Sequence, residues 1–214
     1  MKKMLALGLI TVMTTVCVAC GTTTSEQGSE TTSADTTVSE VTSEETEAVA
    51  IADANEILAK AWAEYNATVS EDLQFPVGGG NVESMVMDGP GKFDVTVEAA
   101  QETLTASYCA TPDFIAKTDD VATLMNMMMA NNFTAAAYHI TDVANMDAGI
   151  AELKDATLNN QWMCGMPETF IVVKVGDSYL VSVFGNGQVV EAFKTALTNV
   201  YGEAAVVSVE ESLM

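Results

Sequence analysis

Apolar residues recur at helical spacing in the segment that follows residue 50. These residues are Ile51, Ala54, Ile57, Leu58, Ala61, Trp62 and Tyr65. The same segment contains a capping-box arrangement of Asp53 and Glu56, which is typical of a helix N-terminus. This spacing predicts an amphipathic helix. Similar spacing predicts a second helix over about 97–106 and a third over about 120–131, whose apolar stripe is Val121, Leu124, Met125 and Met128. Glycine and proline residues make 75–93 a predicted loop.

The pattern then changes to short strands and helices in alternation. It predicts strands over 133–140, 169–175, 179–184 and 204–209, and helices over 143–158 and 188–201. Gly176-Asp177 is typical of a tight hairpin turn, and Gly202 stands where a helix C-terminal cap belongs. The order β-α-β-β-α-β is that of the ferredoxin-like fold, an antiparallel sheet with two helices on one face. We therefore predict an α+β fold of this type with additional N-terminal helices.

The predicted strands are apolar on both faces. In the first strand, for example, Phe133 and Ala137 lie on one face and Tyr138 and Ile140 on the other, and all four are apolar. A half-exposed antiparallel sheet would alternate apolar and polar residues more cleanly. We therefore expect the second face to be covered, by the N-terminal helices in preference to a second protomer.

The first 19 residues have the features of a secretory signal. Lys2 and Lys3 precede an uncharged apolar run, which ends in Val16-Cys17-Val18-Ala19-Cys20-Gly21. This end resembles the lipobox of bacterial lipoproteins, although Cys17 stands where Leu is usual. The resemblance implies that Cys20 is lipidated and holds the protein on the extracellular face of the cell membrane. Ordinary secretion and an uncleaved apolar anchor are the alternatives.

The segment from Cys20 to residue 49 is rich in Ser, Thr, Asp and Glu and has no lysine and no aromatic residue. Such a composition cannot bury enough apolar surface to offset chain entropy. We predict a disordered stalk over 20–49 and a single folded domain over 50–214.

The composition limits the classes of partner. The 214 residues include 30 acids and 8 lysines, with no arginine, for a formal charge of −22. Nucleic-acid binding depends on cationic contacts, so this charge excludes it. An electrostatic partner would be cationic, such as Ca²⁺ or a basic peptide, although an acidic surface also serves solubility alone.

The motifs of common enzymes are missing from the sequence. His139 is the only histidine, and its mid-strand position favours a packed structural role over a catalytic one. The glycines before Lys92 lack the spacing of a phosphate-binding loop. Glu83, Asp88 and Asp94 offer oxygen ligands to a hard cation, but without the density of a calcium loop. We therefore expect no enzymatic activity and no cofactor. A thiol enzyme using Cys164, or one using an acid pair, is a weaker alternative.

Sulfur-containing residues provide the remaining candidates for chemistry. Cys109 and Cys164 allow a disulfide, two buried thiols or a reactive thiol. Thirteen methionines include a group at Met125, Met127, Met128 and Met129, and thioethers are ligands that Cu(I) prefers. Consecutive positions point around a helix rather than to one side, which favours the use of these methionines as core filler.

The segment 159–168 is longer than a helix-to-strand connection needs. It contains an amphipathic tryptophan of the kind favoured in recognition. The candidate partner-binding residues are Trp162, Met163, Cys164 and Met166. A well-packed structural loop is the alternative.

Three stretches carry a resemblance to a known family: residues 75–94, 161–173 and 184–186. They resemble a family of uncharacterised surface lipoproteins of Gram-positive anaerobes, some of which are labelled bacteriocin transport accessory proteins. The resemblance implies a role beside a peptide exporter, with a cationic peptide or a membrane transporter as partner. The sequence thus predicts a membrane-tethered interaction domain, and the alternative is a lipoprotein that binds a small ligand or a metal ion, Cu(I) or Ca²⁺.

Overall fold

The computed structural model describes residues 50–163 and 165–214. The predicted signal peptide, Cys20, the stalk and Cys164 lie outside the described residues. The helices are α1 (Ala54–Thr68), α2 (Glu98–Tyr108), α3 (Pro112–Ile115), α4 (Met146–Leu158) and α5 (Gly187–Tyr201). The strands are β1 (Val77–Gly79), β2 (Val86–Met87), β3 (Gly91–Phe93), β4 (Thr118–Asn126), β5 (Phe133–Ile140), β6 (Thr169–Val175), β7 (Tyr179–Gly185) and β8 (Ala205–Ser212).

All these strands belong to one antiparallel sheet in the order β2-β1-β4-β5-β7-β6-β8. The short strand β3 pairs with β4 as well, along the same edge as β1. The predicted strands 133–140 and 169–175 are confirmed with the same bounds.

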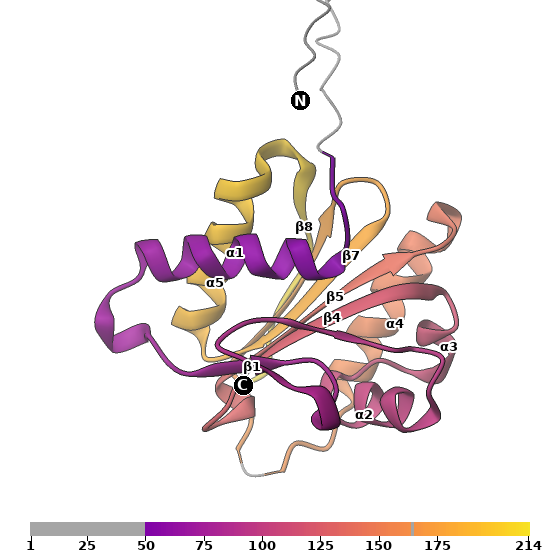
Figure 1. The fold of residues 1–214 in the computed structure, drawn as a ribbon, viewed down its shortest axis with the longest axis horizontal. Helices are drawn as coiled ribbons and strands as arrows, with labels where there is room; N and C mark the ends of the chain where they lie inside the picture. The colour runs from indigo at the N-terminus through magenta and orange to yellow at the C-terminus, as the bar shows by residue number, and fades with distance from the viewer. Residues whose placement is uncertain (1–49, 164) are drawn as a thin grey trace, which may run out of the picture. The chain divides into compact units, whose positions relative to one another are not determined.

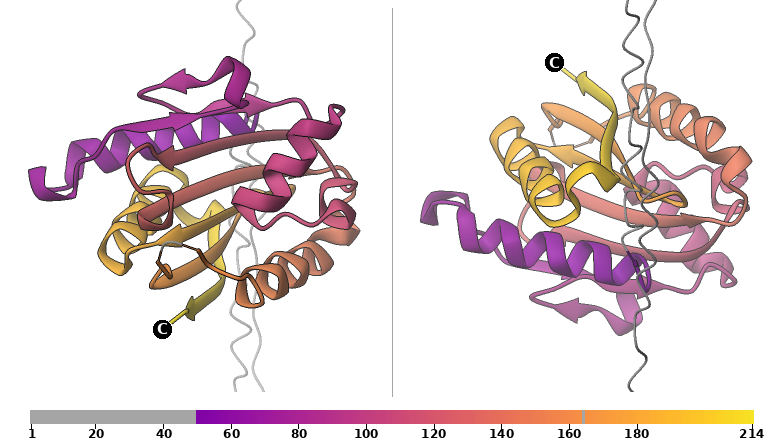
Figure 2. Two further views of the ribbon diagram at one scale, coloured as in Figure 1. Left: turned by 90° about the horizontal axis from the view of Figure 1, so that it is seen from below. Right: turned by 90° about the horizontal axis from the view of Figure 1, so that it is seen from above.

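Helices cover both faces of the sheet, so the prediction of a covered second face is confirmed (Figures 1 and 2). On one face, α1 and α5 pack against side chains such as Leu124, Phe133 and Val183. On the other face, α2, α3 and α4 pack against side chains such as Tyr138, Phe170 and Phe184. Alternate residues of one strand therefore enter two different apolar cores.

The mixed α+β class and the antiparallel sheet are confirmed, but a ferredoxin-like topology is not. In that topology the last strand pairs with the first, and both helices share a face. Here β8 pairs with β6, and β4 lies beside β5 instead. The crossovers β5-α4-β6 and β7-α5-β8 step the same way across the sheet but start from strands that run in opposite directions. Right-handed connections then place α4 and α5 on opposite faces, as observed.

The predicted third helix over 120–131 is wrong, because these residues form the central strand β4 and the turn after it. Val121 and Met125 contact one core, while Ala122 and Leu124 lie in the other. A strand buried on both faces lacks the alternation of apolar and polar residues that identifies a strand. Its apolar residues can then match the spacing of an amphipathic helix by chance. The predicted loop 75–93 contains β1, β2 and β3.

The other predicted helices are confirmed, with shifts of one to three residues at their ends. Asp53 caps α1, because its Oδ1 accepts a hydrogen bond from the backbone N–H of Glu56 (2.7 Å). Gly202 ends α5 with a φ of +54°, a conformation that glycine adopts at low cost. Within the described residues no helix combines the length and the apolar character that crossing a membrane requires.

Candidate functional site

Two loops meet at one end of the sheet and carry most of the predicted site residues. One joins β4 to β5 and contains Met127, Met128 and Met129; the other spans residues 159–168 between α4 and β6. The side-chain amide of Asn131 joins them, because its Nδ2 donates hydrogen bonds to the carbonyl oxygens of Met163 (2.9 Å) and Gly165 (2.6 Å). We call this region the methionine-rich end, comprising Met127, Met128, Met129, Met163 and Met166.

The five side chains of the methionine-rich end are exposed to solvent. Their exposed fractions range from 39% at Met127 to 82% at Met128. A thioether chain in water leaves apolar surface unburied, so the interpretation of Met127–Met129 as core filler is wrong. The end of the chain lies beside this region, because the N–H of Leu213 donates to the carbonyl of Glu168 (2.9 Å).

Local hydrogen bonds hold the methionine turn in place. Oδ1 of the buried Asn126 accepts hydrogen bonds from the N–H groups of Met128 (2.9 Å) and Met129 (3.1 Å). The carbonyl of Asn132 accepts from the N–H of Asn186 (2.9 Å). Gly185 permits this close approach, since a Cβ there would lie 2.3 Å from the Asn132 oxygen. The methionines are thus exposed on a well-defined backbone.

Trp162 is half-buried and supports the second loop. Its ring packs edge-to-face on Phe184 at a centroid distance of 4.8 Å. Its indole Nε1 is buried and has no hydrogen-bond partner among the described residues. The predicted residues therefore divide into a packed tryptophan and exposed Met163 and Met166, while Cys164 lies outside the described residues.

A small cavity of about 170 Å³ opens between the two loops. Its acidic residue is Glu168, whose carboxylate accepts hydrogen bonds from Nδ2 of Asn186 (3.0 Å) and from the N–H of Gly187 (2.7 Å). This carboxylate therefore accepts a hydrogen bond from the first backbone N–H of α5 and stabilises the N-terminus of that helix. The remaining walls are Met129, Asn131, Asn132, Gly165, Met166, Pro167 and Asn186.

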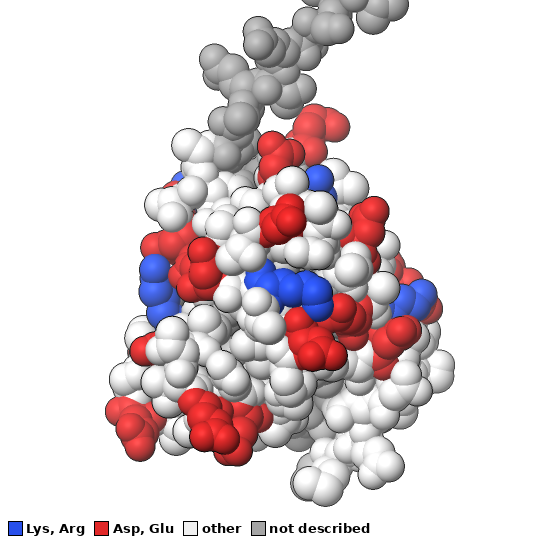
Figure 3. Space-filling model, turned by 90° about the vertical axis from the view of Figure 1, so that its right-hand side faces the viewer, with Lys and Arg blue, Asp and Glu red and all other residues white. Residues whose placement is uncertain are grey.

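Charge is distributed unevenly over the surface. Figure 3 shows the face covered by α2, α3 and α4, where acidic side chains are spread widely and lysines lie next to acids. Lys117, for example, pairs with Glu152 at 2.8 Å. The lower right of this view, below the acidic side chains, has no red or blue atoms. The exposed methionines add apolar surface at the methionine-rich end of an acidic molecule.

The other end of the sheet carries a polar network. Nζ of Lys92 lies 3.0 Å from Oδ2 of Asp53 and 3.5 Å from Oδ1 of Asp120. Oδ2 of Asp120 accepts a hydrogen bond from the N–H of Ala54 (2.6 Å), so the network ties the start of α1 to β4. The Glu56 N–H and then Lys92 hold the pKa of Asp53 below its usual value.

His139 lies at the same end, half-buried. Its Nδ1 is 2.6 Å from Oδ1 of Asp119, and its ring lies 4.9 Å from the ring of Tyr179. These contacts come from neighbouring strands β4 and β7, and they agree with the structural role expected for this residue.

Cys109 is buried at the end of α2 and bonds to no sulfur atom of the described residues. Burial raises the pKa of its thiol to about 11, so it is protonated at neutral pH and a poor nucleophile. This contradicts the reactive-thiol alternative for Cys109. A bridge to Cys164 stays a prediction.

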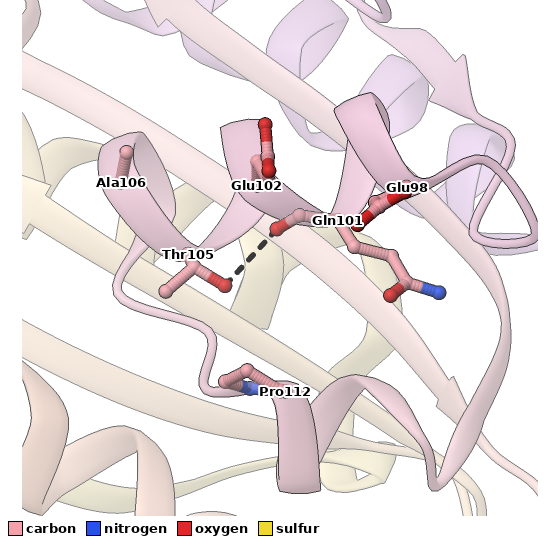
Figure 4. A pocket seen from close by; sticks show the side chains of 6 residues that line it. All are labelled: Glu98, Gln101, Glu102, Thr105, Ala106 and Pro112. Atoms are coloured by element: carbon pink, nitrogen blue, oxygen red, sulfur yellow. Dashed lines mark hydrogen bonds between the residues drawn. The ribbon is translucent and has the colours of Figure 1, made fainter.

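Two further candidates receive no support from the geometry. Within 50–163 and 165–214, no three His, Cys, Asp or Glu residues come close enough to hold a metal ion, so Glu83, Asp88 and Asp94 do not form a calcium site. A groove of about 370 Å³ lies along the outer side of α2 and ends at Pro112 (Figure 4). Thr105 in this groove donates to the carbonyl of Gln101 (3.0 Å), within the same helix. The groove is an open helix surface lined by Glu98, Gln101, Glu102, Thr105, Ala106 and Pro112.

Comparison with protein-family models, curated proteins and solved structures finds no match to this chain. Function must therefore be inferred from the residues themselves.

Proposed function

We propose that the protein is a membrane-tethered, non-enzymatic interaction domain, lipidated at Cys20, that binds a basic peptide with apolar side chains on the outer face of the cell. The observation that carries the proposal is the cluster of five exposed methionines in two joined loops. The role beside a peptide exporter follows from the family resemblance.

Methionine suits a surface of this kind. Its unbranched, polarizable side chain adapts to partners of different shape, and exposed methionines recur at surfaces that accept many sequences. Asn126 and Asn131 form hydrogen bonds to the backbone of Met128, Met129, Met163 and Gly165, whereas the methionine side chains themselves are exposed.

The charge of the chain selects the partner. A formal charge of −22 attracts a cationic peptide over a long range and repels an acidic one. The apolar end then supplies the contact surface for the peptide's apolar residues. A basic amphipathic segment meets both requirements.

The test is binding of a fluorescently labelled helical peptide of lysine and leucine to the full-length lipoprotein, measured by anisotropy. We expect Met128→Gln combined with Met163→Gln to weaken binding at least about tenfold, because these are the most exposed apolar side chains of the five. Val143→Gln is the control, since Val143 is exposed and apolar but lies after the opposite end of β5.

Added salt should weaken binding of the wild-type protein, because screening removes the long-range attraction. Equal affinities of the double variant and the wild type, or equal binding of a glutamate-leucine peptide, would refute the proposal.

A further inference from the structure

Four methionines surround Gly78 of β1. Gly78 is paired with Met87 of β2 on one side and with Met125 of β4 on the other. Directly opposite residues of antiparallel strands direct their side chains to the same face of the sheet. Met87 and Met125 therefore flank the space that Gly78, which has no side chain, leaves open.

Two more thioethers occupy that space. A Cβ added to Gly78 would lie 2.5 Å from Sδ of Met127 and 3.1 Å from Sδ of Met85. Both sulfur atoms thus converge on the point where a side chain of residue 78 would begin. A Cβ at residue 78 would displace the thioether of Met127, whose sulfur lies where the missing side chain leaves space.

The extended backbone at the end of β4 contributes to this arrangement. Met127 directly follows β4, and its N–H donates to the carbonyl of Pro76 (3.0 Å), which continues the pairing of β4 with β1 beyond Met125. Met85 directly precedes β2 and is also extended, and residues two apart in an extended chain point to the same side. In the helix predicted for this segment, Met125 and Met127 would point in different directions. The structure therefore removes the objection that sequence reasoning raised against a thioether metal site.

The cluster is accessible from solvent but partly shielded. Gly78 is buried, Met85 and Met125 are half-buried, and Met87 and Met127 are exposed. Residues that serve only to fill a core would be buried on all sides.

We propose that Met85, Met87, Met125 and Met127 form a binding site for a soft monovalent metal ion, Cu(I). Thioether sulfur is neutral, has no proton to release and favours Cu(I) over the hard cations Mg²⁺ and Ca²⁺. This site shares Met127 with the methionine-rich end but includes neither Met128 nor Met163, and the inference does not depend on the proposed peptide binding.

The test uses Ag(I), which has the same filled d shell as Cu(I) and is stable in air. The full-length chain, labelled with ¹³C at the methionine methyl groups and with accessible thiols alkylated, is titrated and followed by NMR. We expect the methyl signals of the four methionines to shift together and to saturate at one equivalent. The signals of Met146 and Met163 should stay in place. An anaerobic titration with Cu(I) should give the same pattern.

The decisive variant is Gly78→Ala, which keeps all four methionines but adds a methyl group at the point where the sulfur atoms of Met85 and Met127 converge. Gly89→Ala is its matched control, because a Cβ at Gly89 would meet nothing within 4 Å. We expect Gly78→Ala to weaken Ag(I) binding at least tenfold and Gly89→Ala to leave it unchanged. If Gly78→Ala does not fold, Met85→Leu with Met127→Leu should show the same loss, while Met128→Gln with Met163→Gln should bind Ag(I) normally. Wild-type affinity in the double leucine variant, or shifts confined to Met128, Met163 and Met166, would overturn the proposal.

Discussion

The two ends of the sheet differ in how their side chains are held. At the first end, Lys92 lies between Asp53 and Asp120, and His139 faces Asp119. At the methionine-rich end, the backbone is fixed by Asn126 and Asn131, but the methionine side chains extend into solvent. At the first end, Lys92 with its two aspartates ties α1 to the sheet, whereas at the second end unburied apolar groups are available for contact. The difference separates a structural end from an end suited to binding.

The first prediction compares the base of the methionine-rich end with its tip. Phe184→Ala should lower the free energy of unfolding by about 3–5 kcal/mol, because the ring is buried and supports Trp162. Met163→Ala, at an exposed position, should change it by no more than about 0.5 kcal/mol. Urea denaturation measures both. Similar losses in the two variants would show that the tip is part of the core.

The second prediction concerns the structural end. Asp53→Ala removes the N-terminal cap of α1 together with the ion pair to Lys92, and should cost about 1–2 kcal/mol. Lys60→Ala is the control, because Lys60 is exposed and an ion pair at the surface, such as that of Lys60 with Glu56, contributes little to stability. An equal shift of the urea midpoint in both variants would contradict the role of this network.

The third prediction follows from the pKa of Asp53, which is lowered in the folded protein. A lowered pKa means that the ionised carboxylate stabilises the fold above the unfolded pKa of about 3.9, and that this contribution is lost as pH falls through the folded pKa. Asp53→Asn should therefore be less stable than the wild type at neutral pH, and the two stabilities should converge at low pH. Urea midpoints between pH 2 and 7 measure this convergence, and a constant difference would exclude the carboxylate charge as its cause.

The fourth prediction concerns the junction of the two loops. Asn131→Ala removes two hydrogen bonds to the backbone of Met163 and Gly165, which together should cost about 1 kcal/mol locally. Amide hydrogen exchange in residues 161–166 should accelerate about fivefold, while exchange in β6 should not change. Asn159→Ala is the control, since that side chain bonds only to the carbonyl of Asp155 in its own helix. Unchanged exchange in the loop would mean that Asn131 does not join it to the β4–β5 turn.

The fifth prediction has the smallest effect on stability. Dilute hydrogen peroxide should oxidise the exposed Met128 and Met163 before Met146, whose exposed fraction is 5%. Because Met128 is 82% exposed and Met163 is 80% exposed, the unfolding midpoint should stay nearly constant while binding of the lysine-leucine peptide falls. Mass spectrometry of peptic fragments measures the order, and oxidation of Met146 at the same rate would contradict the burial described above.

Local sequence patterns were sufficient to predict most of the helices and strands. The β-branched runs predicted β6, and the capping box predicted α1, because both signals depend on residues close together in the chain. They failed at β4, where burial on both faces removes the alternation that distinguishes a strand. The length of the loop 159–168 pointed to Met163 and Met166. No local sequence pattern indicated that these residues lie near Met128, because the hydrogen bonds of Asn131 that join the two loops span more than thirty positions of the sequence.

The sequence by itself determined the acidic character of the chain, the lipobox-like segment at Cys20, the α+β class and the strands with strong β-branched runs. Composition and short-range periodicity are sufficient for these features. Only the tertiary structure decided that β8 pairs with β6, that α4 and α5 lie on opposite faces, and that Gly78 lies among four methionines. Strand order and register depend on contacts between residues far apart in the chain, and those contacts are chosen by the burial of both faces of the sheet together.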